Sequence, residues 1–453
     1  MTGSAYHVQT DRAGILVDFG MFQGGRMAER SNRVPRGLNL RRLDAVLLTH
    51  AHLDHVGRLP LLAKRGFQGP IFATPATMDL TGLILRDSAK IQAYDAEREN
   101  RKRERQAKPP IEPLYSIGHV EQVLQLLQPA PYDEPIEVAP GIRARFAEAG
   151  HILGSASIQL LIEEGGRRKI VVFSGDLGPR GAPILKDFEC LHRADMVFLE
   201  STYGNRDHRS LDETVKEFED IVEQAVEQKA KILVPTFAVG RAQLIMYLLA
   251  AMFRERRIPK FPIFLDSPMA IEATRIYRRH PELYDEEALA LRQRGQLRHD
   301  LSSVEPTSTA DESKAINNVP GPCLVMAGAG MCNAGRILHH LKQNLWRPET
   351  WVLIVGYQGH GSLGRRLVEG EKRVRIHGET IAVQAKIRTL GGFSAHAGRT
   401  HLLGWFECLA AARPRLVLTH GEARGREALR DGIRERHGIE AELPHQGETL
   451  LLD

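Results

Sequence analysis

The chain has 453 residues, 42% of them hydrophobic and 26% charged, with a formal net charge of +5. A chain of this length and apolar content can form more than one domain. Its small positive charge permits a polyanionic partner but does not require one. No stretch approaches the roughly 20 apolar residues of a membrane-spanning helix, and the N-terminus lacks the apolar segment of a signal peptide. We therefore expect two domains, a cytoplasmic location and no membrane partner.

The cysteine pattern argues against both a disulfide framework and a thiolate metal site. The four cysteines lie far apart and form no CxxC pair: Cys190, Cys323, Cys332 and Cys408. Such spacing favours a reducing compartment, so we expect no disulfide and no cysteine-bound zinc.

The N-terminal part contains short apolar runs that end in small or polar residues and predict buried strands. These runs are 14–19, 43–49, 169–173 and 196–199. Helix-like sequence separates some of them, notably 77–106, which ends in a run of arginine and glutamate. Because i,i+4 ion pairs can form there, the run indicates a solvated helix face rather than an RNA-contacting one.

From Lys231 onward an apolar strand, a Gly- or Pro-containing loop and an amphipathic helix recur four times. The predicted strands are 231–235, 261–265, 322–326 and 351–355. Strands that feed crossover helices imply a parallel sheet, whose post-strand loops gather at one edge where ligands usually bind. Residues after about 380 again show the pattern of the N-terminal part, with short apolar runs that end in small or polar residues. We therefore expect one domain formed by 1–204 and 385–453, interrupted by an inserted domain at 205–384.

The sharpest signal is the segment THAHLDHVG at 49–57, directly after a predicted strand. His50 and His52 can point the same way, while Asp54 and His55 begin the next helical turn, so one motif can serve two metals. Imidazole and carboxylate form the ligand mixture expected for zinc. A polar loop that happens to be rich in histidine is the alternative, and four potential ligands within six residues argue against it.

A two-metal site needs further ligands from other strand ends. The candidates are His151, Asp176 and His420, each beside a glycine near the end of a strand-like segment. Asp18, after the predicted strand that begins at Gly14, is placed to orient a ligand histidine. Taken singly, each of these residues is equally compatible with a structural role. Together with the first motif they form a repeated pattern.

In combination, the HxHxDH motif, Gly-His151, Ser-Gly-Asp176 and Thr-His420-Gly resemble the metallo-β-lactamase superfamily. Glu200 in FLESTYG and His396 in GFSAHAG are similar to signatures of its β-CASP branch. The resemblance covers nearly the whole chain. It implies an α/β fold, in which an αββα sandwich carries an inserted domain built on a parallel, Rossmann-like sheet.

Within the β-CASP branch, three segments of the predicted insertion are similar to those of bacterial relatives of the eukaryotic mRNA 3′-end processing endonuclease. These segments are 235–241, 266–270 and 330–336. Two features depart from the family pattern. Thr2-Gly3-Ser4 follows Met1 directly, without the usual preceding strand, so either the start of the sequence is truncated or the first sheet lacks an edge strand. His360 stands where relatives generally carry another residue, and we interpret it as a loop residue rather than a ligand.

The resemblance implies two Zn²⁺ ions, or another divalent transition metal, with a bridging hydroxide that attacks phosphorus. The implied ligands are His50, His52 and His151 for one metal, Asp54, His55 and His420 for the other, with Asp176 bridging. Asp54, Glu200 and His396 are the implied catalytic residues. Glu200 would orient His396, which donates a proton to the leaving ribose oxygen. The alternative for His396 is a structural residue beside a helix N-cap.

These roles predict a zinc-dependent phosphodiesterase that cuts single-stranded RNA. We expect it to cut within the strand, as an endonuclease. A homodimer is a possible oligomeric state. The alternatives are a 5′ exoribonuclease, a DNA nuclease of the same branch, a small-ester hydrolase and a catalytically silent RNA-binding subunit. A small ester needs no inserted domain, and silent paralogues usually lose ligands that are all present here. His420 favours RNA, because DNA-acting members typically lack this late histidine.

Three predicted helices of the insertion begin with Gly-Arg, at Arg241, Arg336 and Arg365. A cation at a helix N-terminus opposes the helix dipole, so a compensating anion is expected. We therefore predict that these arginines, with Ser267, contact RNA phosphates. The alternative is that they pair with carboxylates across the domain interface.

Overall fold

A computed structural model describes residues 3–23 and 30–452, which form two compact units. The first unit comprises 1–180, 186–207 and 396–453, and the second comprises 181–185 and 208–395. Met1 and Thr2, on which the expectation of a missing first strand rests, lie outside the described residues.

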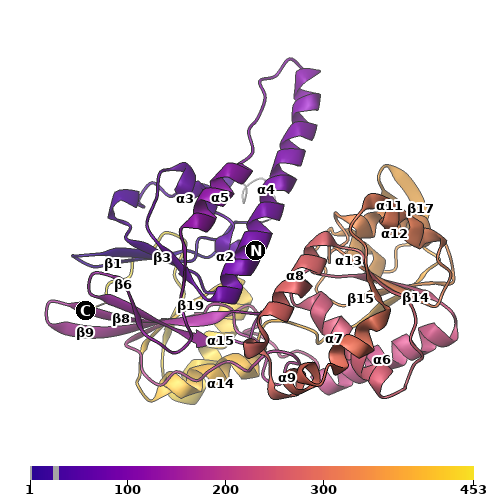
Figure 1. Cartoon of the computed structure of the whole chain (residues 1–453). Helices are drawn as coiled ribbons and strands as arrows, with labels where there is room; N and C mark the ends of the chain where they lie inside the picture. The colour runs from indigo at the N-terminus through magenta and orange to yellow at the C-terminus, as the bar shows by residue number, and fades with distance from the viewer. Residues whose placement is uncertain (1–2, 24–29, 453) are drawn as a thin grey trace. The chain divides into compact units, whose positions relative to one another are not determined.

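The first unit contains two sheets (Figure 1). The five-stranded sheet has the order β1 (Tyr6–Gln9), β2 (Gly14–Val17), β3 (Ala45–Leu47), β4 (Ile71–Ala73) and β5 (Leu127–Pro129). The seven-stranded sheet has the order β20 (Ala441–Glu442), β19 (Arg415–Thr419), β10 (Met196–Glu200), β9 (Arg167–Phe173), β8 (Ala156–Glu164), β7 (Ile142–Glu148) and β6 (Ile136–Ala139). The predicted strands of this part therefore form, with ends shifted by a few residues.

Helices cover the outer faces of the two sheets. They are α2 (Leu53–Val56), α3 (Leu59–Lys64), α4 (Pro75–Glu104), α5 (Ile117–Gln125), α14 (Arg399–Ala410) and α15 (Ala423–His437). Ile15 and Leu47 of the first sheet share a buried cluster with Phe146 of the second, so the sheets pack face to face. Trp405 of α14 and Leu429 of α15 belong to a separate cluster on the second sheet. This is the predicted αββα sandwich.

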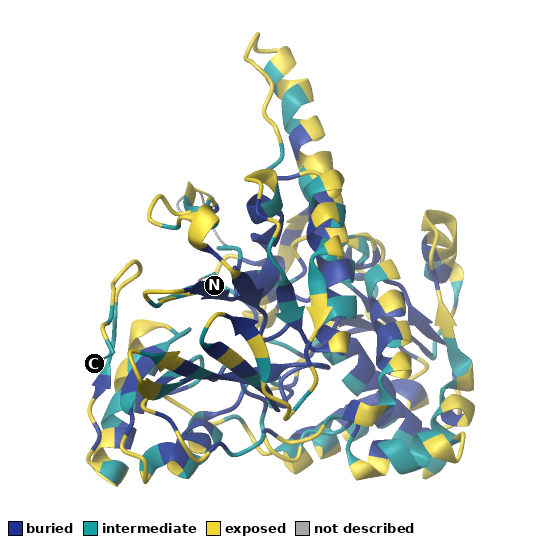
Figure 2. Ribbon diagram, turned by 60° about the vertical axis from the view of Figure 1, so that its left-hand side comes forward, coloured by how far each residue is buried: buried dark blue, intermediate teal, exposed yellow. Residues whose placement is uncertain are grey.

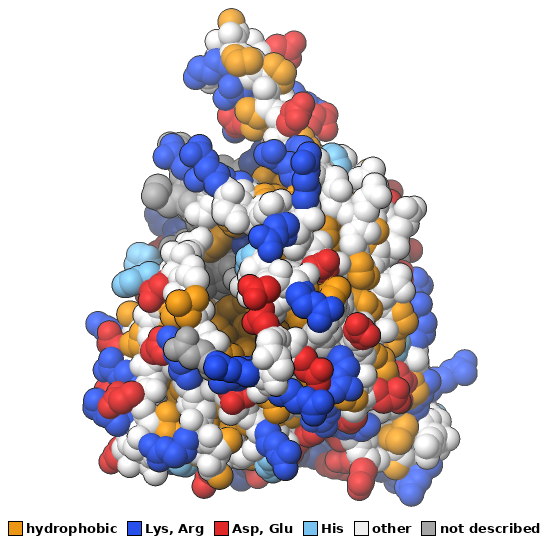
Figure 3. Space-filling view, turned by 90° about the vertical axis from the view of Figure 1, so that its left-hand side faces the viewer, with side chains coloured by type: hydrophobic (Ala, Val, Ile, Leu, Met, Phe, Trp, Pro, Cys, Tyr) orange, Lys and Arg blue, Asp and Glu red, His pale blue; other side chains and the backbone are white. Residues whose placement is uncertain are grey.

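The predicted helix 77–106 is observed as α4. Thr74 caps its N-terminus by accepting a hydrogen bond from the backbone N–H of Thr77, and Pro75 occupies the first turn, where its missing N–H costs nothing. Towards the other end the helix is largely exposed (Figure 2). Arg101 pairs there with Glu97, and basic and acidic side chains alternate on the projecting segment in Figure 3. The charge run therefore forms a solvated helix face, as predicted.

The expectation that no cysteines pair is wrong. Cys190, in the loop before β10, and Cys408, on α14, form a disulfide with their Cα atoms 5.7 Å apart. They are 218 residues apart in sequence, and packing brings them together, because Leu191 and Leu409 beside them belong to the same buried cluster. Cys323 and Cys332 are free and buried.

The second unit is built on a six-stranded sheet in which all neighbouring strands are parallel. The order is β13 (Val304–Pro306), β12 (Ile263–Leu265), β14 (Cys323–Ala327), β11 (Lys231–Pro235), β15 (Thr350–Ile354) and β18 (Lys386–Thr389). A small hairpin adds β16 (Arg373–Ile376) and β17 (Glu379–Ala382). The helices are α6 (Leu211–Glu227), α7 (Arg241–Arg254), α8 (Pro268–Arg279), α9 (Glu286–Gln293), α10 (Gln296–Asp300), α11 (Ala310–Ala315), α12 (Arg336–Asn344) and α13 (Leu363–Val368).

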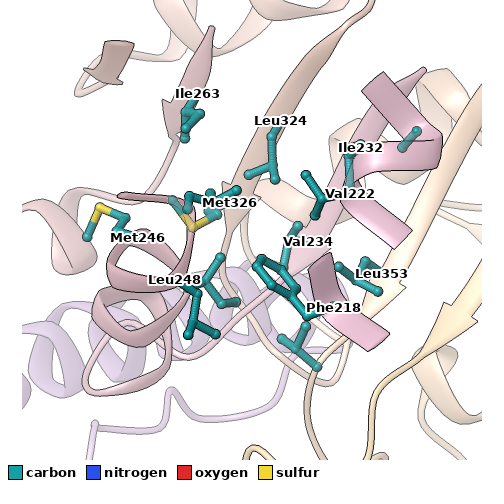
Figure 4. Packing of buried hydrophobic residues seen from close by; sticks show 14 of the residues in the cluster. Phe218, Val222, Ile232, Val234, Met246, Leu248, Ile263, Leu324, Met326 and Leu353 are labelled. Atoms are coloured by element: carbon teal, nitrogen blue, oxygen red, sulfur yellow. The ribbon is translucent and has the colours of Figure 1, made fainter. Parts of the chain in front are cut away.

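Alternating residues of the central strands pack on opposite faces of this sheet. Val234 of β11 packs with Phe218 of α6 and Leu248 of α7 on one face (Figure 4). Leu233, one position earlier, packs with Leu341 of α12 on the other. Both faces of the sheet are therefore buried, which explains why its strands appear in the sequence as continuous apolar runs. The predicted parallel, Rossmann-like sheet is confirmed.

None of the helices in the described ranges combines the length and apolarity needed to cross a bilayer.

Candidate metal centre

The HxHxDH motif occupies the connection between β3 and α2. His50 is buried in the loop after β3, and His52 is the N-cap of α2. Asp54 and His55 lie in that four-residue helix, and both are buried. A strand that ends and a helix that begins within a few residues thus bring four potential ligands to one edge of the first sheet.

One group of ligand atoms joins this loop to two other segments. His52 Nδ1 lies 3.1 Å from His50 Nε2 and 3.0 Å from His151 Nε2. Asp176 Oδ2 lies 3.5 Å from His50 Nε2 and 3.7 Å from His151 Nε2. Ligand nitrogens of a tetrahedral zinc ion stand about 3.3 Å apart, given Zn–N bonds of about 2.0–2.1 Å. The spacing of these four residues therefore fits one ion.

A second group contains the remaining predicted ligands. His420, directly after β19, has its Nε2 3.2 Å from His55 Nε2 and 3.4 Å from Asp54 Oδ2. Asp176 Oδ1 lies 3.1 Å from His420 Nδ1 and 3.4 Å from His55 Nε2. All seven predicted ligands are thus brought together in two groups, each able to hold a metal ion.

Asp176 connects the two groups, because each of its carboxylate oxygens faces a different set of imidazoles. Its side chain is only 1% exposed, and burial alone would raise its pKa. The charges of His420 and His55, whose own pKa values are raised, outweigh burial and hold the pKa of Asp176 well below its usual range. Burial lowers the pKa of His50, and lowers that of His52 to about 4, so both imidazoles stay neutral near pH 7. Ionised carboxylate and neutral imidazole are the forms that bind metals, so His50 and His52 are already in that form. Against the effect of burial, the pKa values of His55 and His420 are raised by Asp176, so metal binding would displace protons from these two rings.

Asp18 lies behind the second group, as expected for a residue that orients a ligand. Its Oδ2 is 2.8 Å from His55 Nδ1, and it accepts hydrogen bonds from the hydroxyl and backbone N–H of Thr49. When Asp18 accepts the Nδ1 proton, the Nε2 lone pair of His55 is directed to the metal side. Asp18 has a left-handed backbone, with φ of 58°, which its backbone N–H stabilises by donating to Leu47 O.

Glu200 and His396 form a pair next to Asp176. Glu200, the last residue of β10, accepts hydrogen bonds from the backbone N–H groups of Leu177 at 2.9 Å and Thr202 at 3.1 Å. His396 Nδ1 lies 3.5 Å from Glu200 Oε1 and 3.8 Å from Asp176 Oδ2. Burial would lower the pKa of His396, but Glu200 and Asp176 outweigh it and raise the pKa to about 9.

The predicted RNA contacts lie in the second unit, where one helix start differs from the prediction. Arg241 and Arg336 begin α7 and α12, each after a glycine with positive φ. Arg365 lies inside α13, which begins at Leu363, so the third Gly-Arg start is wrong. The cause is Ser362, whose side chain accepts a hydrogen bond from Arg365 N and caps the helix earlier.

The three arginines predicted to contact RNA have different contacts in the structure. Arg336 Nη1 donates to Asp266 Oδ1 at 2.7 Å, and Arg336 also donates to the carbonyls of Thr307 and Ser308. Arg336 therefore pairs with a carboxylate, but within the second unit and not across the domain interface as the alternative interpretation had it. Arg365 pairs with Glu369, the C-cap residue of its own helix, and Arg241 lies 5.8 Å from the centre of the Phe393 ring.

Ser267, the last of the predicted RNA contacts, is the N-cap of α8. Its side chain accepts a hydrogen bond from Ala270 N, so its hydroxyl serves the helix start.

Sequence reasoning missed residues whose role depends on the fold. No role was predicted for Thr49, yet its hydroxyl donates a hydrogen bond to Asp18 Oδ2 and lies 3.1 Å from His50 Nδ1. Its place at the end of a buried strand was the one available signal. His340, bound to Asp266 at 2.6 Å, was also missed, because nothing in the sequence links residues 74 positions apart.

His360 lies in the turn between β15 and α13, in the second unit. It is outside the groups of described residues that could hold a metal ion.

Comparison with protein families gives three matches. The metallo-beta-lactamase superfamily matches residues 1–236, the Beta-Casp domain matches 242–367, and the Zn-dependent metallo-hydrolase RNA specificity domain matches 380–444. The first match alone spans more than half of the chain.

Curated relatives agree with these matches. Ribonuclease TTHA0252 of Thermus thermophilus is 40% identical over 99% of this chain and 97% of its own length. Transcription termination factor FttA of Methanosarcina mazei is 31% identical over 99% of this chain and 69% of its own. The corresponding factor of Cenarchaeum symbiosum is 31% identical over 97% and 67%. The chain therefore belongs to the metallo-β-lactamase superfamily and, within it, to the β-CASP ribonuclease family.

Proposed function

We propose that the chain is a metal-dependent ribonuclease that hydrolyses phosphodiester bonds within single-stranded RNA. The observation that carries this proposal is the arrangement around Asp176, whose two oxygens face two separate ligand groups with an acid–base pair beside them. The relatives named as a ribonuclease and as transcription termination factors support RNA as the substrate, as does the match to an RNA specificity domain.

Two Zn²⁺ ions suit the donor set, which offers five imidazoles and two carboxylates. His50, His52 and His151 would hold one ion, Asp54, His55 and His420 the other, and Asp176 both. When bound, such ions lower the pKa of water toward about 7 and stabilise the charge that develops on the phosphoryl oxygens.

The protein's own contribution to the chemistry is a positioned proton. Against the effect of burial, the carboxylate of Glu200 raises the pKa of His396, which suits a group that gives a proton to the leaving ribose oxygen. Glu200 is fixed by two backbone N–H groups, so it holds the Nδ1 side of the imidazole and leaves Nε2 for proton transfer. Asp54, the remaining implied catalytic residue, would act as a metal ligand, since its carboxylate lies beside His420 in the second ligand group.

Endonucleolytic cutting, a cytoplasmic location and a homodimer remain predictions. A 5′ exoribonuclease and a DNA nuclease are the nearest rival functions, since both use the same metal chemistry.

Metal analysis tests the ligand assignment. We expect purified protein to carry about two zinc-class ions per chain, because seven ligand side chains exceed what one tetrahedral ion uses. Asp176→Ala should lower the content, and His360→Ala should not, since His360 lies in the other unit. Trace metal in protein prepared without chelators, with no uptake of added zinc, would contradict the assignment.

Removing the proton donor tests the mechanism. His396→Ala should slow RNA cleavage by roughly 10²–10⁴-fold, the usual range for general acid catalysis, with metal content unchanged. A substrate whose leaving ribose oxygen is replaced by sulfur needs no proton, so the variant should cut it at nearly the wild-type rate. His401→Ala, on the neighbouring helix, is the matched control.

An equal defect on both substrates would show that His396 does not donate the proton. Loss of metal from His396→Ala would make this residue a ligand instead.

Digestion of RNA labelled internally or at one end tests the substrate and the mode of cutting. Endonucleolytic action predicts fragments of intermediate length from both substrates and much slower cutting of DNA of the same sequence. Release of single nucleotides from the 5′ end would establish the exonuclease, and equal rates on DNA would establish the DNA nuclease. Faster turnover of a chromogenic ester than of RNA would favour the small-ester hydrolase.

A further inference from the structure

Two exposed aromatic side chains lie at one edge of the sheet of the second unit. Phe237 follows β11 and is 44% exposed, and Tyr357 follows β15 and is 62% exposed. The two strands are hydrogen-bonded parallel neighbours, so the loops after them emerge at the same edge. This is the edge at which ligands usually bind in open α/β sheets.

The loops that carry these aromatic side chains are tightly packed. The ring of Phe237 lies so close to Gly330, after β14, that a Cβ atom there would stand 2.9 Å from the ring. A Cβ at Gly356, the residue before Tyr357, would stand 3.7 Å from the same ring. Buried Gln358 donates from Nε2 to the carbonyls of Gly330, at 2.8 Å, and Gly356, at 3.2 Å. The ring of Phe237 is therefore supported on one side by backbone, although much of the residue is exposed.

This arrangement is unusual within the chain. The described residues include four exposed large aromatic side chains: Tyr94, Phe237, Trp346 and Tyr357. Tyr94 lies on α4 in the first unit, and Trp346 precedes β15, at the opposite edge of the sheet. Only Phe237 and Tyr357 come from adjacent loops, and a hydrophobic core explains neither.

We propose that Phe237 and Tyr357 form a stacking platform for bases of single-stranded RNA. Every base has an aromatic face, so such a platform holds a strand without reading its sequence. Glycine backbone lies against the ring of Phe237, and the described residues include no other exposed large aromatic side chain at this edge, whereas a protein partner needs a larger continuous apolar patch. The proposal rests on the proposed function, because it assigns to the second unit a contact with the same substrate.

The test compares normal RNA with abasic RNA of the same length, which keeps the phosphates but has nothing to stack. Binding is measured on metal-loaded protein with the His396→Ala substitution to prevent cleavage. Phe237→Ala and Tyr357→Ala should each weaken binding of normal RNA roughly 5- to 100-fold, the effect of losing one stacked base. Binding of abasic RNA and the salt dependence should stay unchanged, because no phosphate contact is lost.

Further variants separate stacking from packing. Phe237→Leu keeps an apolar side chain that fills space but cannot stack, so it should bind normal RNA nearly as weakly as Phe237→Ala. Tyr357→Phe keeps the ring and should bind like the parent protein. Trp346→Ala, which removes an exposed ring at the other edge of the sheet, is the matched control and should have no effect.

Three results would overturn the platform. The first is that Phe237→Ala and Tyr357→Ala bind normal RNA as tightly as the parent protein. The second is that these variants lose the same affinity for normal RNA and for abasic RNA. The third is that the parent protein binds both RNAs equally, which would mean that the two rings do not contact bases. In each of these cases, the proposed function still stands if the wild-type protein cuts RNA. If the wild type neither binds nor cuts RNA, the proposed function fails, and the platform fails with it.

Discussion

The arrangement of the first unit depends on one buried carboxylate. Asp176 is almost completely shielded from water, and an isolated charge in such a place is strongly disfavoured. Its two oxygens are each within 3.7 Å of two imidazole nitrogens, so the negative charge is matched from both sides. Two cations on either side of the carboxylate would complete this balance. The same imidazoles lie close enough together to serve as ligands of such cations.

The fold supplies these ligands from chain segments that are distant in sequence. The first sheet contributes the loop after β3, and the second contributes Asp176 after β9 and His420 after β19. β9 and β19 flank β10, which ends at Glu200. Asp176, His420 and Glu200 therefore share one edge of the sandwich because its strands end there, and His396 reaches the same place from the segment before α14. Packing of the two sheets against each other fixes the distance between the two ligand groups.

Sequence reasoning succeeded where a feature is local. The spacing of the HxHxDH motif, the strand before Asp18 and the repeated strand–loop–helix pattern each depend on a few neighbouring residues. The parallel sheet followed from the repeated pattern, whereas the αββα sandwich was implied by the family resemblance. It failed where two distant segments meet. The bond between Cys190 and Cys408 depends on the packing of α14 and has no local signal. The pairing of Arg336 with Asp266 is of the same kind, since a Gly-Arg dipeptide cannot reveal which anion it meets. The start of α13 was missed because a serine cap two residues earlier outweighed the pattern.

Anomalous X-ray diffraction at the zinc absorption edge, on crystals of the zinc-loaded protein, tests the central claim most directly. Two anomalous peaks should appear, one beside each carboxylate oxygen of Asp176, with His50, His52 and His151 around the first and Asp54, His55 and His420 around the second. A single peak, or peaks away from Asp176, would contradict the two-metal centre.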